Sequence, residues 1–219
     1  MQIFGFPLSP FVRKVLVVAA EKGIEVDNVL FHPRQPPPEF LAASPFRKIP
    51  ALRDGDYTLA DSTAIANYLD ALCPEPPILP VDARGRGKAV WFEEFADTIM
   101  VPAGGKVVFN RFVAPKLLAM AGDEEAAAKG EEELVPLLAY LESQAPADGW
   151  LAGEAFSIGD VAVASTLASL AYASPLLSAA AHPATVAWFE RVKARPAWQQ
   201  VTAHERKALA SRVQAATGG

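Results

Sequence analysis

The sequence predicts an α/β N-terminal part followed by an all-helical C-terminal part. Within residues 1–74, short apolar runs alternate with helical periodicity, the pattern expected of strands and helices that pack together. Residues 74–82 contain four of the nineteen prolines, which is typical of a stiff connection between two units. From residue 83 onward strand signals end and alanine-rich helical periodicity takes over. We therefore expect two domains, 1–74 and 83–219, joined by a Pro-rich linker at 75–82.

Composition and charge exclude several classes of function. The 219 residues carry a net charge of −5 and 51% of them are hydrophobic, which indicates a globular protein and argues against nucleic-acid binding. No clear apolar run is long enough to span a bilayer and no secretory signal is evident, so we expect a cytoplasmic protein without a membrane partner. The single cysteine, Cys73, excludes an internal disulfide, and three scattered histidines give no metal-ligand spacing.

Residues 2–31 predict a strand, a helix and a second strand. Pro10 suits the first helical position, Ser9 is a plausible N-cap, and Gly23 is a fitting end. Apolar residues follow one face of this helix, and the charged residues take the other face, namely Arg13, Lys14, Glu21 and Lys22. We expect Arg13 to be a solvated surface charge. The order strand, helix, strand implies a right-handed crossover and a parallel pair.

The segment 38–74 completes the first domain. Residues 38–44 predict a short helix, and Asp54-Gly55-Asp56 between two apolar runs predicts a hairpin over 51–60. A further helix begins at Ser62 and ends before Pro74. The resulting β-α-β-α-β-β-α order is the thioredoxin-like layout. In that layout redox cysteines begin the first helix, whereas this chain has the hydroxyl of Ser9 there.

The second domain reads as helices throughout. One helical stretch covers about 83–119, with Pro102 and Gly104-Gly105 expected to kink or break it, and another runs from Asp123 to about Gln144. Ser157 and Asp160 form a capping box at the start of a nearly all-apolar helix, 158–173, which we expect to be buried on all sides. We also expect three tryptophans in the core, namely Trp91, Trp188 and Trp198.

A family resemblance spans both domains. Pro-Glu-Phe-Leu-Ala (38–42), Pro-Phe-x-Lys-Ile-Pro-Ala-Leu (45–52) and Asp-Gly-Asp-x-Thr-Leu-x-Asp-Ser (54–62) resemble the glutathione-binding domain of cytosolic glutathione transferases, most closely the serine-type phi class and its bacterial phi-like members. The capping box and Ala-Arg-Pro-Ala-Trp (194–198) resemble the helical domain of that family. The resemblance implies a detoxifying transferase that forms homodimers, uses glutathione as co-substrate without a metal, and conjugates it to a small hydrophobic electrophile.

The resemblance also gives Ser9 a catalytic role. A hydroxyl that donates a hydrogen bond to the glutathione sulfur, at the positive end of a helix, favours the thiolate and lowers the pKa of the thiol. On the residues alone, Ser9 as an ordinary helix cap is the better interpretation.

Further residues take glutathione-binding roles by the same resemblance. The backbone of Ile49 would pair with the cysteinyl part beside a cis bond to Pro50, while Asp61 and Ser62 would hold the γ-glutamyl end. Ordinary helix capping is the other interpretation of Asp61 and Ser62.

Recognition of the glycyl carboxylate is less determined. Lys48 matches a residue that reaches this carboxylate in related classes, and a solvated lysine is an equal alternative. Gln35 stands where phi-class members commonly have His, and Pro36 replaces the following Lys. Recognition therefore departs from the phi pattern here, and Arg34 or Lys48 would compensate.

We expect the electrophile to bind between the domains, against mostly apolar walls. Candidates from the first loop and helix and from the long helical stretch are Phe6, Leu8, Phe11, Phe95, Ile99 and Phe109. For each of them core packing is an equally good interpretation. Two alternatives stay open: a glutathione-dependent peroxidase, isomerase or dehalogenase on the same fold, or a non-catalytic scaffold protein that retains the fold.

Overall fold

A four-stranded sheet forms the base of the molecule. The structure, a computed structural model, describes the backbone of residues 1–217 and the side chains of residues 1–212. The sheet has the order β2-β1-β3-β4, and its strands are β1 (Gln2–Phe4), β2 (Asp27–Val29), β3 (Ala51–Asp54) and β4 (Tyr57–Ala60). β2 is parallel to β1, and β3 is antiparallel to both β1 and β4. The predicted parallel pair and the predicted hairpin are confirmed.

The hairpin turn follows from local chemistry. Asp54 pairs with Tyr57, so that Gly55 and Asp56 form a two-residue loop. Gly55 adopts a φ of 62°, a left-handed value that glycine reaches without a Cβ clash. This turn fixes the register of β3 against β4, and therefore which residues of β3 face the core.

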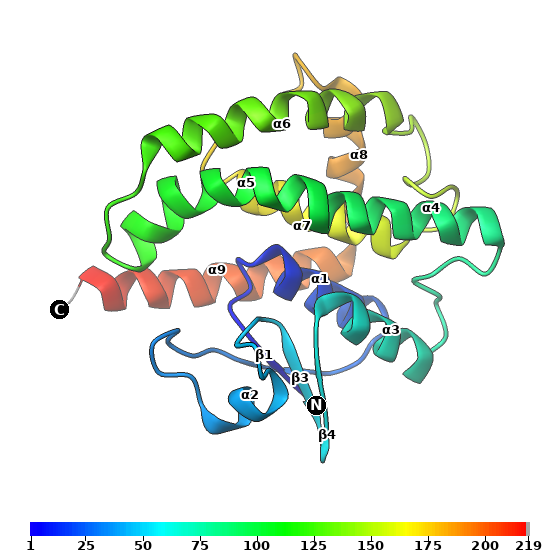
Figure 1. Ribbon diagram of the computed structural model, residues 1–219. Helices are drawn as coiled ribbons and strands as arrows, with labels where there is room; N and C mark the ends of the chain where they lie inside the picture. The colour runs from blue at the N-terminus through cyan, green and yellow to red at the C-terminus, as the bar shows by residue number, and fades with distance from the viewer. Residues whose placement is uncertain (218–219) are drawn as a thin grey trace.

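Three helices belong to the N-terminal half: α1 (Pro10–Glu21), α2 (Pro38–Ala43) and α3 (Ser62–Leu72). Figure 1 shows α1 and α3 on the side of the sheet that faces the remaining helices, with α2 on the other side. Residues 73–82 then connect α3 to the helical half. This connection is packed against the protein, because Ile78 and Leu79 are buried and Lys22 Nζ donates to the Cys73 and Pro76 carbonyl oxygens at 2.7 and 2.8 Å.

The helical half begins with one continuous run over residues 83–117. It consists of α4 (Ala83–Glu94), the π-helical segment η1 (Phe95–Met100), α5 (Val101–Val108) and the π-helical segment η2 (Phe109–Leu117). The expected break at Pro102 and Gly104-Gly105 does not occur. One π-helical segment precedes Pro102 and another contains Pro115. The hydrogen bonds of the helix thus change to the wider π pattern near the prolines, which have no N–H to donate.

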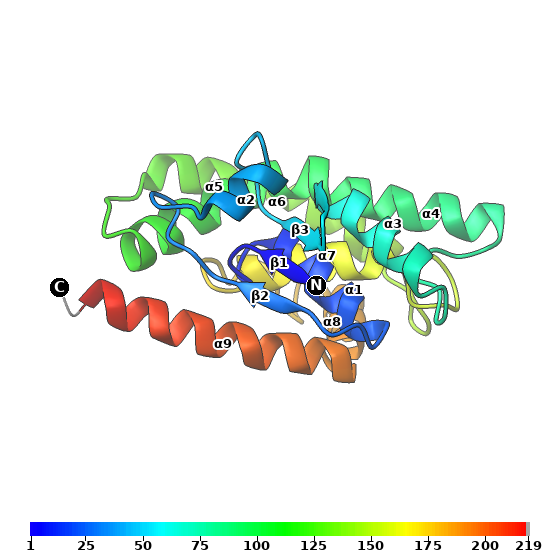
Figure 2. The same ribbon diagram turned by 90° about the horizontal axis from the view of Figure 1, so that it is seen from below.

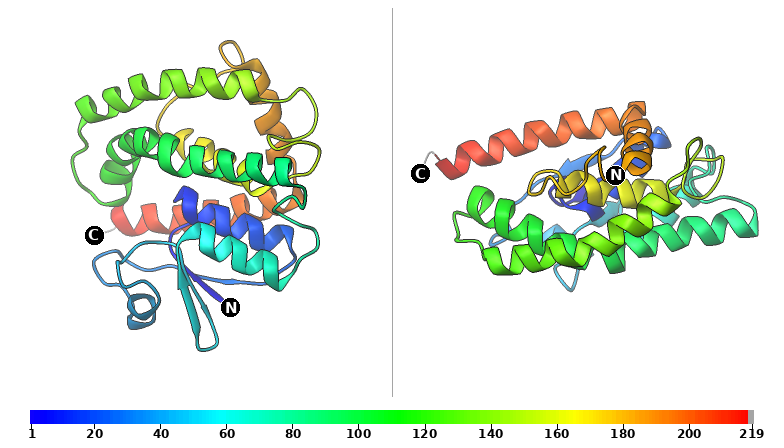
Figure 3. Two further views of the ribbon diagram at one scale, coloured as in Figure 1. Left: turned by 45° about the vertical axis from the view of Figure 1, so that its right-hand side comes forward. Right: turned by 90° about the horizontal axis from the view of Figure 1, so that it is seen from above.

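The remaining helices are α6 (Glu124–Gln144), α7 (Ile158–Leu170), α8 (Pro183–Lys193) and α9 (Pro196–Thr217). α7 lies at the centre of the helical half and packs against α1, α4, α5 and α8 (Figure 3). The predicted capping box is present at its start, with Ser157 N donating to Asp160 Oδ2 at 3.1 Å. No helix among residues 1–217 has both the length and the apolar character needed to cross a membrane.

The two halves share a core, and α1 lies in the middle of it. α1 packs on α3, α7 and α9, so that only part of the predicted polar face reaches solvent. Contrary to expectation, Arg13, Lys14 and Lys22 are buried, at 2%, 0% and 6% exposure. Each is neutralised by a carboxylate from another element, since buried cations need a partner. Trp91 also departs from expectation, because it is 46% exposed.

Candidate functional site

The loop between β1 and α1 presents the hydroxyl of Ser9. Ser9 has extended backbone angles at the N-cap position of α1, and its carbonyl oxygen accepts from Arg13 N at 2.9 Å. Its side chain makes no capping hydrogen bond to the backbone of the first turn of α1. The Oγ is therefore available for a ligand at the positive end of a twelve-residue helix.

A short stretch of backbone beside Ser9 is also available for hydrogen bonding. The Ile49–Pro50 bond is cis, and Ile49 lies just before β3. Among the described residues neither the N–H nor the C=O of Ile49 has a hydrogen-bond partner. Ser44 holds the preceding loop, since its Oγ donates to the Lys48 carbonyl oxygen at 2.7 Å and accepts from Lys48 N at 2.9 Å. An extended peptide can pair with such an edge.

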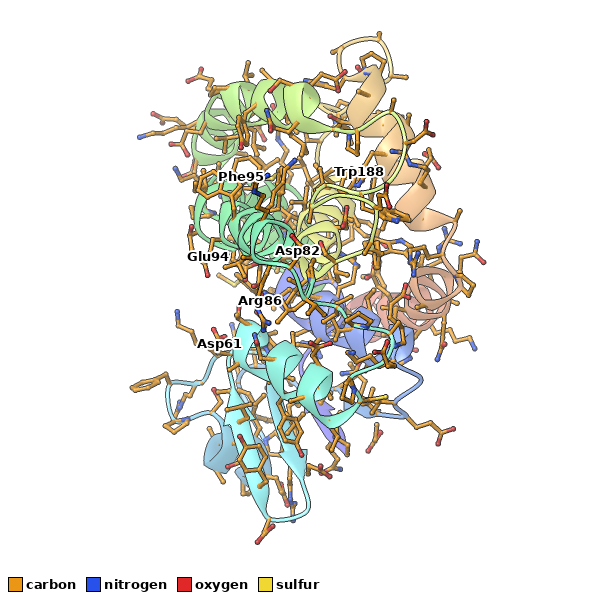
Figure 4. All side chains as sticks on the ribbon, turned by 90° about the vertical axis from the view of Figure 1, so that its right-hand side faces the viewer. Asp61, Asp82, Arg86, Glu94, Phe95 and Trp188 are labelled. Atoms are coloured by element: carbon orange, nitrogen blue, oxygen red, sulfur yellow. The ribbon has the colours of Figure 1, made fainter. Side chains whose placement is uncertain are left out.

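The start of α3 provides polar groups at the same side of the sheet. Asp61 is the N-cap, and its Oδ1 accepts from Thr63 N at 2.9 Å and from Ala64 N at 3.0 Å. It adopts a φ of 81°, which is costly for a residue with a Cβ and occurs most often where function requires it. Ser62 is 3% exposed at the first helical position. Figure 4 shows Asp61 at the edge of the N-terminal half that faces the helical half.

A buried ionic cluster lies behind this helix end. Thr63 Oγ1 donates to Glu93 Oε1 at 2.7 Å, and Lys14 Nζ lies 2.8 Å from Glu93 Oε1 and 2.5 Å from Asp97 Oδ2. Burial raises the pKa of Asp97, although the charge of Lys14 and its hydrogen bond oppose this. The cluster ties α1, α3 and the long helix together, so the position of the α3 N-terminus depends on the helical half.

An apolar cavity of about 320 Å³ opens between the two halves next to Ser9. Its walls include Ser9, Ile49 and four of the predicted electrophile-binding residues, namely Phe6, Leu8, Phe11 and Phe109. The structure does not place Phe95 or Ile99 in these walls. Phe95 is 2% exposed and packs against Tyr140 with ring centroids 5.1 Å apart, while Ile99 is 38% exposed outside the cavity. Helical periodicity predicts on which face of its helix a residue lies, but it does not predict which other elements cover that face.

The two candidates for the glycyl carboxylate lie outside the cavity. Gln35 is exposed in the loop after β2, where its N–H donates to the His32 carbonyl oxygen at 2.8 Å. Lys48 is exposed in the loop before β3, and its side chain forms no hydrogen bond within the described residues.

Sequence reasoning missed three polar residues of the cavity. Thr166 and Ser169 project from α7, and Arg212 comes from α9. Thr166 and Ser169 could have been found as hydroxyl residues one turn apart in an otherwise apolar helix. Arg212 carries no signal in the sequence, because only the packing of α9 brings it to the cavity.

A further buried network fixes the loop that carries Ser9. Ser169 Oγ donates to the Leu8 carbonyl oxygen at 2.7 Å, and Arg13 Nη1 donates to Ser169 Oγ at 2.9 Å. Arg13 is ion-paired with Glu205 of α9, and its Nε donates to Glu205 Oε2 at 2.8 Å. Tyr172 donates to the other oxygen of Glu205 at 2.8 Å, and burial together with that carboxylate raises the pKa of Tyr172 to about 12. The fold is thus thioredoxin-like, with a hydroxyl at the start of α1 facing an apolar cavity between the two halves.

Comparison with known proteins identifies the family. The family model for "Glutathione S-transferase, N-terminal domain" matches residues 3–77, and the one for "Glutathione S-transferase, C-terminal domain" matches residues 99–196. "Glutathione S-transferase 3" of Zea mays is 35% identical over 210 residues, 93% of each chain. The solved apo structure of glutathione S-transferase III is 33% identical, with a TM-score of 0.80 over 92% of this chain and 95% of that one.

The chain therefore belongs to the glutathione transferase family, and these relatives place it with the phi class. A relative with a different name has the same overall length and fold. "FtsZ-localized protein A" of Caulobacter vibrioides is 27% identical over 213 residues, which cover 94% of this chain and 92% of that protein.

Proposed function

We propose that this transferase binds glutathione along the Ile49 edge and uses Ser9 to stabilise its thiolate. The observation that carries the proposal is the free Ser9 hydroxyl, at the start of α1 and in the wall of an apolar cavity. A cysteine thiol has an ordinary pKa of about 8.5. A hydrogen bond from Ser9 Oγ and the positive helix end both stabilise the thiolate, so a larger fraction of bound glutathione is nucleophilic at neutral pH.

The glutathione backbone would lie across the residues already described. The N–H and C=O of Ile49, beside Pro50, pair with the cysteinyl unit, and Asp61 with Ser62 receives the γ-glutamyl end. Among the described residues the second carboxylate oxygen of Asp61 has no hydrogen-bond partner, which supports an interaction with the γ-glutamyl amine, and the α3 N-terminus supports one with its carboxylate. Lys48 and Gln35 remain our candidates for the glycyl carboxylate. In this arrangement the domain of residues 1–74 binds glutathione, and residues 83–219, beyond the linker at 75–82, supply most of the cavity wall.

The electrophile would occupy the apolar cavity beside the sulfur. The thiol proton leaves to solvent, the sulfur lone pair attacks an electron-poor carbon, and a leaving group departs with the bonding pair or the pair remains on an activated alkene. Phe6, Leu8, Phe11 and Phe109 would provide the apolar contacts. We propose that this reaction takes place in the cytoplasm as part of detoxification.

The test combines calorimetry with kinetics. Ser9→Ala should lower kcat by about 100-fold, the usual cost of losing one hydrogen bond to a reacting anion, and should change the Kd for glutathione less than about 3-fold. Ser62→Ala should instead abolish measurable binding of glutathione. Ser211→Ala, an exposed serine of α9, serves as the control and should change neither quantity. Unchanged turnover in Ser9→Ala would refute the catalytic role, and no binding by the wild type would favour the scaffold alternative.

We also propose that the chain forms a homodimer. Several large apolar side chains are unusually exposed, which is typical of a surface that another chain covers. They include Phe46 at 86%, Leu72 at 53% and Trp91 at 46%. Sedimentation should give twice the chain mass of 23.3 kDa, and Trp91→Glu should shift the population towards the monomer. A wild type that sediments as a monomer at all concentrations would refute this proposal.

A further inference from the structure

A second cavity adjoins the proposed electrophile cavity and contains cationic side chains. This side cavity has a volume of about 300 Å³ and is lined by His32 and Arg34 from the loop after β2, by residues 117–120, and by Arg212 of α9. The two cavities share four residues in their walls, namely Pro33, Leu117, Leu118 and Arg212. Figures 1 and 2 show the C-terminal end of α9 on the same side of the molecule as this loop and the end of η2.

The charged side chains that line the two cavities are cationic. Arg212 is the one residue with a formal charge among the described residues that line the apolar cavity, and it is partly buried. The side cavity adds the guanidinium of Arg34 and the imidazole of His32, and no carboxylate lines either space within residues 1–212. Among the described side chains none forms an ion pair with Arg212.

The overall charge of the protein does not explain this arrangement. The chain carries a net charge of −5, so its general field repels anions. Elsewhere the structure pairs its buried cations with carboxylates, as Arg13 with Glu205 and Lys14 with Glu93. A guanidinium left unpaired against an apolar wall is suited to a planar anionic group such as a carboxylate or sulfonate, which it can bind through two parallel hydrogen bonds.

We propose that the preferred electrophiles are amphipathic anions, with an apolar body in the cavity beside Ser9 and an acidic group bound by Arg212. This inference rests on the proposed function for the substrate itself, but the binding preference can be tested without turnover. Few polar groups in an apolar pocket set the orientation of a ligand. Arg212 would thus direct the reactive carbon towards Ser9 by holding the opposite end of the molecule.

A matched pair of fluorescent dyes tests the binding preference. 1-Anilinonaphthalene-8-sulfonate and uncharged N-phenyl-1-naphthylamine differ only in the sulfonate. We expect Arg212→Met to weaken binding of the sulfonate dye by about 10-fold and to change binding of the uncharged dye less than about 2-fold, the difference expected for one charge-assisted contact. Arg212→Lys should retain part of the preference. Lys207→Gln, an exposed cation on the same helix, should change neither dye, and Leu118→Trp, which fills the shared wall, should weaken both.

Turnover should depend on the charge of the substrate in the same way as dye binding. The neutral aryl halide 1-chloro-2,4-dinitrobenzene and the anionic 4-chloro-3-nitrobenzoate both lose chloride to a thiolate. Arg212→Met should lower kcat/KM for the benzoate about 10-fold more than it lowers kcat/KM for the neutral substrate. Equal effects on both members of either pair would overturn the inference. A raised KM for glutathione with both substrates would also overturn it, because Arg212 would then bind the tripeptide. Absence of turnover with an intact dye preference would instead refute the proposed transferase reaction alone.

Discussion

Glu205→Gln tests whether the buried network behind Ser9 holds the two halves of the protein together. The substitution keeps the shape of the side chain but removes the charge that neutralises Arg13. Arg13 and Glu205 are 2% and 3% exposed, so solvent cannot replace the lost partner. Removing one member of a buried ion pair typically costs about 3–5 kcal/mol, and the cost comes from the charge that is left behind.

The structure favours the lower end of this range. Arg13 Nη1 retains the Ser165 carbonyl oxygen at 2.7 Å and Ser169 Oγ at 2.9 Å. We therefore expect a loss of about 3 kcal/mol, which lowers Tm by about 10 °C in a chain of this size. Because Ser169 Oγ also donates to the Leu8 carbonyl oxygen, we expect kcat to fall as the Ser9 loop loses its support.

Thermal unfolding followed by circular dichroism measures this loss. Glu190→Gln is the matched control, since Glu190 pairs with Lys193 at the surface and should contribute little. The double variant Arg13→Met with Glu205→Leu should recover most of the stability, because it leaves no buried charge without a partner. A Tm change in Glu205→Gln as small as in Glu190→Gln, or a double variant less stable than the single one, would refute the reasoning.

Two further predictions concern packing and pH. Gly159→Ala should destabilise the protein by about 1–3 kcal/mol in urea unfolding, because its Cβ would lie 2.8 Å from the Ala89 carbonyl oxygen. Gly87→Ala has open space around the added Cβ and should stabilise the protein by about 0.5 kcal/mol. The reverse order of the two stabilities would contradict this account of the packing. Tyr172 has a pKa raised to about 12 by burial and by Glu205, so its contribution to stability is complete below its ordinary pKa of about 10 and is lost as pH rises through about 12. In Glu205→Gln the tyrosinate absorbance of Tyr172 should appear at lower pH than in the wild type. The Tyr172→Phe variant, which lacks this absorbance, identifies it. An unchanged titration would contradict the conclusion that Glu205 raises the pKa of Tyr172.

The sequence alone determined the order of the elements in the N-terminal half and the local signals that begin and end them. Asp54-Gly55-Asp56, Pro10 and the capping box at Ser157 and Asp160 are local signals, and each acts through residues a few positions apart. The short motifs at 45–52 and 54–62 lie on adjoining elements, so the neighbourhood of Ile49 and Asp61 was evident before the fold was known.

Tertiary structure alone decided which polar residues are buried and which apolar residues line the cavity. Arg13 and Lys14 occupy the polar face of an isolated α1, yet α3, α7 and α9 cover that face and supply the carboxylates that make their burial possible. Phe95 and Phe109 look alike as apolar helix residues, but only Phe109 reaches the cavity. Arg212 reaches both cavities because α9 crosses back over the first half, a contact between residues almost two hundred positions apart. Periodicity describes one helix at a time, whereas burial depends on every element packed around it.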